Sequence, residues 1–284
     1  MVWRRSQMPE FDGQVVVVTG AGSGIGQETA RLFGQEGAVV VAVDITHEKV
    51  QQTVGLVIDA GGHAWAVACD IADPAQVKRL MDHVVGEYGR LDVLINNAGI
   101  IMPGFIEDIE DDEWRRVVDV NLSGVFYCTK YALPELKRRR GAIVNLASMN
   151  GLVGQMKNPA YSATKGGVIA MTRSLAIDVA PFGVRVNAVC PAGVLTPLLQ
   201  EWFQQQPHPD VMREYTDLSH MLGRTATPRE IANLILFLAS PRSSFITGQA
   251  IPIEGGATLG YGVGPKPEWA VGGFERTQGE KDNG

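Results

Sequence analysis

Short, almost continuously apolar runs alternate with longer helical patterns along most of the chain, and no other feature constrains the fold as much. Strands that are apolar throughout are typical of parallel sheets buried on both faces, with helices connecting the strands. The predicted strands are 14–19, 38–44, 63–69, 91–95, 142–146, 184–190 and 248–253. The predicted helices are 24–35, 48–60, 74–88, 111–139, 159–180 and 228–239, with an irregular helical stretch at 197–221.

This alternation predicts an α/β fold, in which right-handed crossovers wind a parallel sheet of about seven strands with helices on both faces. No linker interrupts the series, so we expect residues 1–259 to form one domain. Residues 260–284 are rich in glycine, proline and charge, and they show no periodicity. This tail is expected to be either disordered or packed against a neighbouring subunit. Ligands of such sheets bind beyond the carboxyl ends of the strands.

The composition excludes several classes of protein. The 284 residues are 45% hydrophobic and carry a formal net charge of −6, which is typical of a globular protein. The acidic balance argues against nucleic acid, because binders of phosphate backbones need clustered Lys and Arg. Cys69, Cys128 and Cys190 are widely spaced in apolar stretches, which favours a reducing cytoplasm. No apolar run is long enough to cross a membrane, and the five histidines lack metal-ligand spacing, so no membrane and no catalytic metal are expected.

The first predicted strand ends in a glycine-rich turn, residues 19–26, which opens the first helix. Glycines allow a tight turn and a close approach of the backbone to a pyrophosphate, while the helix N-terminus offers free N–H groups. The segment therefore predicts a dinucleotide site that contains Gly20, Ser23, Gly24, Ile25 and Gly26. The alternative is an ordinary tight turn between a strand and a helix.

Asp44 ends the second predicted strand, 18 residues beyond Gly26, the last glycine of the turn. A carboxylate at this place accepts hydrogen bonds from both hydroxyls of an adenosine ribose and repels a 2′-phosphate. Its neighbours Ile45 and Thr46 are uncharged, and the glycine-rich turn contains no Arg or Lys. The sequence therefore predicts NAD rather than NADP, with the alternative that Asp44 only caps the next helix.

Tyr161 and Lys165 are four residues apart in a predicted helix, so their side chains lie on one face. A nearby ammonium stabilises a phenolate, so we expect the pKa of Tyr161 to be lowered and the phenol to exchange a proton near neutral pH. Ser148 follows the fifth predicted strand, where its hydroxyl could hold a substrate oxygen or only form a turn. Asn121 lies in mid-helix, which indicates either a local backbone bond or a kink that directs a polar group inward.

These motifs, in this order, resemble the short-chain dehydrogenase/reductase family over about residues 10–259. The segments that carry the resemblance are 19–26, 96–99, Asn121, Ser148 and 161–165. The resemblance implies a Rossmann-type sheet and a catalytic set made of Asn121, Ser148, Tyr161 and Lys165. In that set Tyr161 is the general acid/base, and Ser148 orients and polarises the carbonyl or alcohol. Lys165 binds the nicotinamide ribose and lowers the pKa of Tyr161, and Asn121 holds a water in a proton relay.

The resemblance also extends to the cofactor. It implies that Asp70 lies near the adenine amino group, and that Asn97, Ala98 and Gly99 line the adenosine side. Val194 and Thr196 match the positions that hold the carboxamide and the phosphates. The remaining residues of the expected cofactor site are Ile45, Ile71, Tyr161, Lys165 and Pro191.

The chain departs from the family pattern at Ala192, where glycine is usual. If that position needs a positive φ, alanine costs some strain; otherwise its methyl group narrows the nicotinamide pocket. In this family the stretch equivalent to 197–221 forms a substrate lid. Here it is rich in apolar residues, which favours a hydrophobic substrate, although the same residues could pack on the core or on a subunit. The expected substrate contacts are Asn150, Gln155, Met156, Ala192, Leu199 and Trp202.

The resemblance therefore implies an NAD-dependent alcohol dehydrogenase or ketone reductase, which exchanges a hydride between a hydrophobic secondary alcohol and its ketone. Two alternatives are an NADP-dependent ketoacyl-thioester reductase and a regulatory protein that binds NAD without turnover. The reductase would be expected to show basic residues near Ser23 or Ile45, which the sequence lacks. The family also implies a homo-oligomer, usually a tetramer, with contacts through helices 111–139 and 159–180.

Overall fold

The seven strands in the described part of the chain lie parallel in one sheet, as the sequence predicts. The computed structural model describes residues 9–259 and orders the strands β3-β2-β1-β4-β5-β6-β7. The strands are β1 (Val15–Thr19), β2 (Val39–Asp44), β3 (His63–Ala68), β4 (Val93–Asn96), β5 (Ala142–Leu146), β6 (Arg185–Pro191) and β7 (Ala250–Ile253). The order reverses between β1 and β4, so the sheet is doubly wound. The predicted fold class is confirmed.

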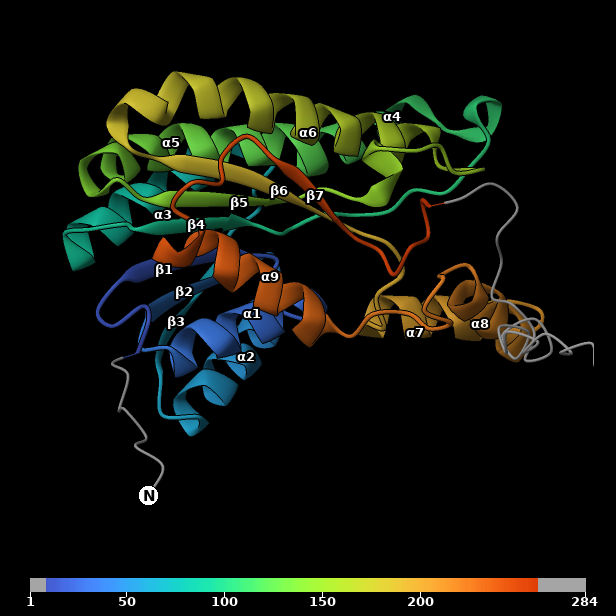
Figure 1. Cartoon of the computed structure of the whole chain (residues 1–284), viewed down its shortest axis with the longest axis horizontal. Helices are drawn as coiled ribbons and strands as arrows, with labels where there is room; N and C mark the ends of the chain where they lie inside the picture. Colours follow the sequence, from blue (N-terminus) through green and yellow to red (C-terminus); the bar gives the residue numbers. More distant parts are fainter. Residues whose placement is uncertain (1–8, 260–284) are drawn as a thin grey trace, which may run out of the picture.

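Helices cover both faces of this sheet (Figure 1). One layer contains α1 (Gly24–Gln35), α2 (His47–Asp59) and α9 (Pro228–Ala239). The other contains α3 (Pro74–Tyr88), α4 (Asp111–Val118), α5 (Gly124–Arg139) and α6 (Pro159–Val179). Successive valines of β1 point to opposite faces, because Val16 and Val18 pack in one apolar cluster while Val15 and Val17 pack in another. The continuous apolar runs of the sequence are thus explained by burial on two sides.

Two helical predictions need correction. The expected single helix 111–139 is interrupted by a π-helical turn, η2 (Asp119–Ser123), between α4 and α5. The acidic residues 111–113 lie inside the first turn of α4, because Glu110 is the N-cap of this helix and pairs with Glu113 in a capping box. The irregular stretch 197–221 contains two regular helices, α7 (Pro197–Gln204) and α8 (Pro209–Leu218). The remaining short turns are η1 (Ile106–Asp108), η3 (Met149–Gly151), η4 (Ala180–Phe182) and η5 (Pro241–Ser243).

A chain of buried polar side chains crosses the middle of the sheet and fixes the two central strands to their helices. Asn96 Nδ2 donates hydrogen bonds to Thr129 Oγ1 on α5 (3.2 Å) and to Asn145 Oδ1 on β5 (2.8 Å). Asn145 Nδ2 donates in turn to Thr172 Oγ1 on α6 (2.9 Å). Buried amides are costly unless paired, so these bonds fix the relative positions of α5, β4, β5 and α6.

Helices α7 and α8 lie beyond the carboxyl ends of the strands, apart from the two layers that cover the sheet (Figure 1). This is the edge at which the sequence places the candidate site. The predicted tail, 260–284, lies outside the described residues, and the domain boundary at residue 259 stays a prediction. Among residues 9–259, no helix is both long enough and apolar enough to span a bilayer.

Candidate active site

The glycine-rich turn between β1 and α1 has a backbone that only glycine accommodates easily. Gly20 and Gly24 have φ values of +64° and +56°, which L side chains rarely adopt. A Cβ at Gly26 would lie 2.1 Å from the carbonyl oxygen of Gly20, so a side chain there is excluded by contact. Ser23 is the N-cap of α1 but makes no side-chain capping bond, and the first N–H groups of the helix are left available for an anion.

Residues at the end of β4 hold this turn in place. Thr19 Oγ1 accepts hydrogen bonds from the backbone N–H groups of Asn97 (3.0 Å) and Ala98 (3.1 Å). Asn97 Nδ2 donates to the carbonyl oxygens of Thr19 (2.9 Å) and Gly20 (3.0 Å). The side-chain NH2 of Asn97, a residue expected on the adenosine side, is therefore bonded to the protein backbone and holds the shape of the turn.

Asp44 connects the end of β2 to the glycine-rich turn. Its Oδ2 accepts a hydrogen bond from the N–H of Gly22 (3.1 Å), and its Oδ1 accepts one from the N–H of Thr46 (3.1 Å). The N-cap of α2 is Thr46, so the alternative that Asp44 is merely the cap of that helix is wrong. Ile45, next to it, is 59% exposed.

A basic residue that the sequence analysis overlooked lies at this corner. A Cβ at Gly22 would lie 2.8 Å from Asp44 Oδ2 and 2.9 Å from Lys49 Cβ, so the stem of Lys49 adjoins the ribose side of the turn. Lys49 lies in the first turns of α2, five positions after Asp44 in the sequence. Only the folding of α2 back against the turn brings this ammonium-bearing side chain close to Asp44 and Gly22.

At the next strand along the sheet, Asp70 is paired with a side chain from a distant helix. Its Oδ2 is 3.2 Å from Nη1 of Arg116 on α4, and its Oδ1 accepts a hydrogen bond from the N–H of Ala72 (3.0 Å). Ile71 is buried and lies against Gly124 at the start of α5, where a Cβ would be 2.6 Å from Ile71 Cδ1. Ile71 is thus a core residue by its side chain, and Arg116 is a further charged group at the predicted adenine end.

The π-helical turn turns Asn121 inward, as the kink alternative predicts. The Asn121 side chain is fully buried and bonds to both backbone groups of Ile100, with Oδ1 accepting from N–H and Nδ2 donating to C=O, each at 2.8 Å. Nδ2 is also 3.3 Å from Thr164 Oγ1 on α6. The side chain thus joins the segment after β4 to α6.

Lys165 and Tyr161 lie on one face of α6, beside the carboxyl end of β5. Lys165 is 3% exposed, and its Nζ donates a hydrogen bond to the carbonyl oxygen of Leu146 (2.7 Å). Nζ also lies 5.6 Å from the centroid of the Tyr161 ring. A Cβ at Gly99 would be 3.4 Å from Nζ and 3.2 Å from Asn121 Oδ1, so the absence of a side chain at Gly99 leaves room between them. The structure brings four sequence-predicted residues together here.

The ionisation of this pair differs from the expectation. Burial lowers the pKa of the Lys165 ammonium to about 8. Burial raises the pKa of the Tyr161 phenol, while the nearby Ser148 side chain acts in the opposite direction. The predicted lowering of the pKa of Tyr161 by Lys165 is therefore wrong for this structure, because desolvation of the phenolate is the larger effect.

Ser148 lies just beyond β5 and is 7% exposed. Its Oγ accepts a hydrogen bond from the N–H of Asn150 (3.1 Å), which opens the short turn η3. Asn150 is also buried, and its Nδ2 donates to Gln155 Oε1 (2.6 Å). Met156 is 78% exposed, so its side chain points into solvent in this structure. Of the predicted substrate contacts, Asn150 is the one directly joined to Ser148.

The loop after β6 carries Ala192 without backbone strain. In the described part of the chain, the non-glycine residues with positive φ are Arg140 and Lys157, so Ala192 has an ordinary conformation. Of the two consequences considered for this alanine, strain is therefore excluded. Pro191 ends β6 and is buried, and Val194 pairs with Ala226 in an isolated parallel bridge. Thr196 lies against the glycine-rich turn, because a Cβ at Gly24 would be 2.9 Å from Thr196 Cγ2.

The predicted lid begins directly after this loop. Thr196 is the N-cap of α7, and its Oγ1 accepts a hydrogen bond from the N–H of Leu199 (3.3 Å). Phe203 is buried, whereas Trp202 is 36% exposed, with its ring centroid 5.6 Å from that of Phe203. Helix α7 is therefore anchored by one aromatic side chain while the other lies at the surface. Residues 9–259 contain no group of three or more His, Cys, Asp or Glu side chains arranged to hold a metal ion.

Comparison with known proteins gives consistent matches over nearly the whole described chain. A family model described as enoyl-(acyl carrier protein) reductase matches residues 20–258. The chain is 42% identical over 252 residues to a meso-2,3-butanediol dehydrogenase of Serratia marcescens, covering 89% of this chain and 97% of that protein. It is 41% identical over 251 residues to a 3-oxoacyl-(acyl-carrier-protein) reductase of Thermotoga maritima, covering 88% and 99%.

Similarity extends to solved structures. A crystal structure of carveol dehydrogenase from Mycobacterium avium in complex with NAD has a TM-score of 0.84 and 30% sequence identity. The match covers 89% of this chain and all of that one. The two polypeptides thus share their fold over most of this chain.

The buried Lys165 predicts a pH dependence of stability. Its pKa is about 8 in the folded protein and 10.5 in an unfolded chain, so between these values the unfolded chain binds more protons and stability rises with pH. From pH 7.5 to 10, the free energy of unfolding of the wild type should gain about 2 kcal/mol relative to Lys165→Met. Denaturant unfolding across this range measures it. The exposed Lys130→Met is the matched control, and parallel curves for wild type and Lys165→Met would contradict the assignment.

Proposed function

This chain belongs to the short-chain dehydrogenase/reductase family, and on that basis we propose that it is an oxidoreductase acting on a hydrophobic secondary alcohol or its ketone with NAD. The observation that carries the proposal is the meeting of Ser148, Tyr161 and Lys165 at the carboxyl end of β5. Ser148 acts on the phenol of Tyr161 from the end of β5, and Lys165 Nζ lies 5.6 Å from the centroid of the phenol ring, so the three residues form a site for moving a proton at one oxygen atom.

The residues at the strand ends fit a nicotinamide dinucleotide. The turn formed by Gly20, Gly24 and Gly26 lets a pyrophosphate approach the uncapped N-terminus of α1, and Asp44 offers carboxylate oxygens to a ribose. Thr196 faces the same turn from the loop after β6. When bound, the dinucleotide supplies the hydride acceptor for alcohol oxidation, or the donor for ketone reduction.

The protein's own groups manage the proton and the position of the substrate. In alcohol oxidation, Tyr161 Oη takes the hydroxyl proton as the carbinol C–H bond breaks and the hydride leaves; in reduction Tyr161 returns the proton. Ser148 Oγ holds the same substrate oxygen. Lys165 places its amine beside the phenol ring, with Nζ 5.6 Å from the ring centroid. Asn121 holds the segment after β4 against α6 and so fixes the position of the backbone beside Lys165.

An apolar substrate is proposed from the lid and from the relatives. The exposed apolar side chains of α7 and α8 include Leu198, Trp202, Val211 and Tyr215, which face solvent at the carboxyl edge of the sheet. Such side chains gain stability by covering an apolar ligand. The matched relatives whose printed names are butanediol and carveol dehydrogenases act on alcohols, which supports the same class here.

The ketoacyl-thioester reductase alternative is supported by the Thermotoga relative and by Lys49, which lies near Asp44. We favour the NAD enzyme because the carboxylate of Asp44, rather than a cation, makes the hydrogen bond to the glycine-rich turn. A regulatory protein without turnover has no need of Ser148 and Lys165 beside the phenol of Tyr161. Absence of turnover with a broad panel of alcohols and ketones would favour that alternative.

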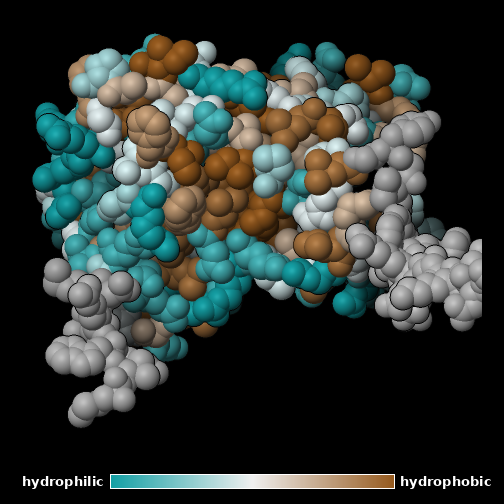
Figure 2. Space-filling view, viewed as in Figure 1, coloured by the Kyte–Doolittle hydropathy of each residue, from teal (hydrophilic) through white to brown (hydrophobic). Residues whose placement is uncertain are grey.

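The oligomeric state and the compartment belong to the same proposal. Helices α4, α5 and α6 and the turn after α6 expose large apolar side chains, including Trp114, Phe126, Ile177 and Phe182. Figure 2 shows a second apolar area between α9 and β7, the edge strand of the sheet. Apolar helix faces and an open strand edge both favour self-association, so we propose a homotetramer. The three cysteines are buried and unpaired, which is consistent with a reducing cytoplasm.

Removing the phenolic hydroxyl tests the proton-transfer role. Tyr161→Phe should lower kcat for secondary-alcohol oxidation by at least about 100-fold while leaving the dissociation constant of NADH within about threefold. Steady-state absorbance and NADH fluorescence measure the two quantities. Tyr127→Phe, on α5, is the matched control and should retain activity. Substantial turnover by Tyr161→Phe would refute the assignment.

Removing one charge tests the cofactor preference. Asp44→Asn keeps an oxygen acceptor for the Gly22 N–H but removes the negative charge that repels a 2′-phosphate, so the ratio of kcat/KM for NAD to that for NADP should fall by about tenfold or more. Adding Lys49→Met should reverse part of the gain with NADP, because the stem of Lys49 lies against Gly22 at this corner and carries a positive charge. Asp59→Asn, exposed at the end of α2, is the control. An unchanged ratio would contradict the role of Asp44.

Shortening the exposed aromatic side chain tests the lid. Trp202→Ala should raise KM for bulky cyclic alcohols by about tenfold and alter KM for 2-propanol by less than about twofold, since only the large substrate loses apolar contact. The exposed Leu56→Ala on α2 serves as the control. Equal effects on large and small alcohols would show that Trp202 does not contact the substrate.

A further inference from the structure

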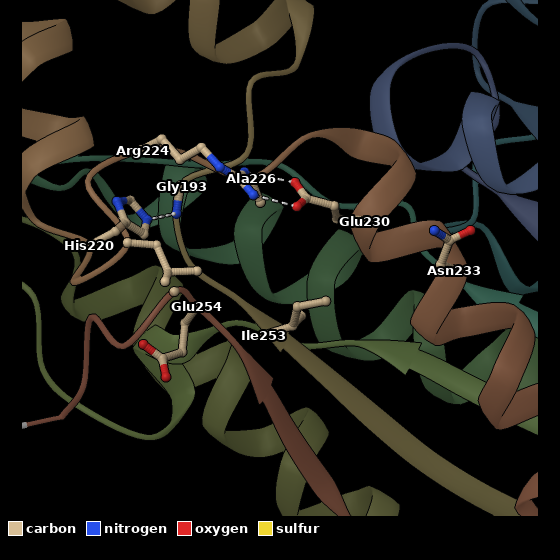
Figure 3. A pocket seen from close by; sticks show the side chains of 10 residues that line it. Gly193, His220, Arg224, Ala226, Glu230, Asn233, Ile253 and Glu254 are labelled. Carbon is tan, nitrogen blue, oxygen red and sulfur yellow. Dashed lines mark hydrogen bonds and ion pairs between the residues drawn. The ribbon is translucent and has the colours of Figure 1, made fainter.

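A buried histidine links the end of the lid to the loop that follows β6. His220 comes directly after α8 and is 2% exposed. The backbone N–H of Gly193 donates a hydrogen bond to its Nε2 (3.1 Å), as Figure 3 shows. On the other side of the ring, Nδ1 is 2.8 Å from the carbonyl oxygen of Thr216 on α8. We refer to His220 with these two hydrogen bonds as the His220 bridge.

The two partners determine the state of the imidazole. A carbonyl oxygen only accepts, so Nδ1 must carry a proton, and an N–H only donates, so Nε2 must be unprotonated. The ring is therefore the neutral Nδ1–H tautomer, with both nitrogen atoms used. Each nitrogen serves a different segment, one the lid helix and the other the loop after β6.

Gly193 is shaped to fit this ring. A Cβ at Gly193 would lie 3.0 Å from His220 Cε1 and 3.1 Å from Thr225 Cγ2, so a side chain would push the imidazole away. The loop also pairs with the segment after α8, because Ala226 N–H donates to Gly193 C=O (2.9 Å) and Leu195 N–H donates to Ala226 C=O (2.8 Å). The contact is a fitted junction between two segments that are distant in sequence.

The junction lies next to the residues proposed to bind the nicotinamide end of the cofactor. Val194 follows Gly193 directly, and Thr196 is both the N-cap of α7 and a neighbour of Gly24. A shift of Gly193 is thus transmitted over one to three residues to Val194 and Thr196. A shift of α8 reaches the same loop through the imidazole.

A cavity of about 280 Å³ adjoins the bridge, and we assign no ligand to it. Its charged groups are already paired, since Arg224 forms two hydrogen bonds with Glu230 (3.0 and 2.7 Å; Figure 3) and Glu254 Oε2 accepts one from the N–H of Thr258 (3.0 Å). The cavity leaves space beside the imidazole that no side chain fills.

We propose that His220 is a positioning residue that couples the lid to the loop after β6, so that the substrate and the nicotinamide end of the cofactor are held by one connected unit. This inference rests on the proposed function for the identity of the ligands. The coupling itself rests on the two hydrogen bonds and on the fit of Gly193.

Two variants separate the two nitrogen atoms of the ring. Counted in bonds from the backbone, the amide of Asn reaches the place of Nδ1 and that of Gln the place of Nε2. His220→Asn therefore keeps a donor for Thr216 and loses the acceptor for Gly193, whereas His220→Gln keeps that acceptor. The exposed N-cap of α8 offers the matched control, His208→Asn.

Amide hydrogen exchange on the ligand-free protein tests the bridge without relying on activity. The peptide that contains residues 191–196 should exchange at least about tenfold faster in His220→Asn than in the wild type. It should exchange at near wild-type rates in His220→Gln and His208→Asn. Unchanged exchange in His220→Asn, or equally fast exchange in both His220 variants, would overturn the bridge.

Kinetics test what the bridge does. In His220→Asn, KM for both the alcohol and NAD should rise about tenfold, while kcat and its pH profile stay near wild type, because the proton-transfer groups are untouched. His220→Gln should restore both KM values. A loss confined to kcat, or KM values unchanged in His220→Asn, would refute the positioning role. If the variants show the expected exchange rates but the wild-type protein turns over no alcohol or ketone, the result contradicts the proposed function and leaves the His220 bridge intact.

Discussion

The parallel direction of β1, β4 and β5 is the constraint on which the site depends. Because these strands run the same way, the glycine-rich turn, the segment after β4 and Ser148 all emerge at one edge of the sheet. Hydrogen bonds between Thr19 and the N–H groups of Asn97 and Ala98 then fix two of these segments against each other. The residues proposed to bind the cofactor and those proposed to transfer the proton therefore share one frame.

Burying polar groups is costly, and the chain places them where they hold that frame. Asn96 and Asn145 join the central strands to α5 and α6, and Asn121 uses a π-helical turn to bond with the backbone of Ile100. Burying the charged form of Lys165 also costs free energy, because burial lowers the pKa of its ammonium to about 8. Its bond to the carbonyl oxygen of Leu146 compensates part of that cost and holds it beside Tyr161.

Local signals made most of the architecture predictable. Asp73 and Pro74 mark the start of α3, and Thr227 with Glu230 forms the capping box that opens α9, so these helices begin where the sequence predicts. The π-helical turn at 119–123 has no local signal strong enough to distinguish it from a continuous helix. Likewise α7 and α8 are short and partly exposed, so their apolar periodicity is weak and the stretch reads as irregular.

The sequence by itself determined the order of strands and helices, the glycine-rich turn, and the spacing that puts Tyr161 and Lys165 on one helix face. These features depend on local periodicity and on residues a few positions apart. Only the tertiary structure decided that burial raises the pKa of Tyr161, that Lys49 lies beside Asp44, and that His220 meets Gly193. Desolvation and contacts between distant segments arise from packing, which no local pattern in the chain specifies.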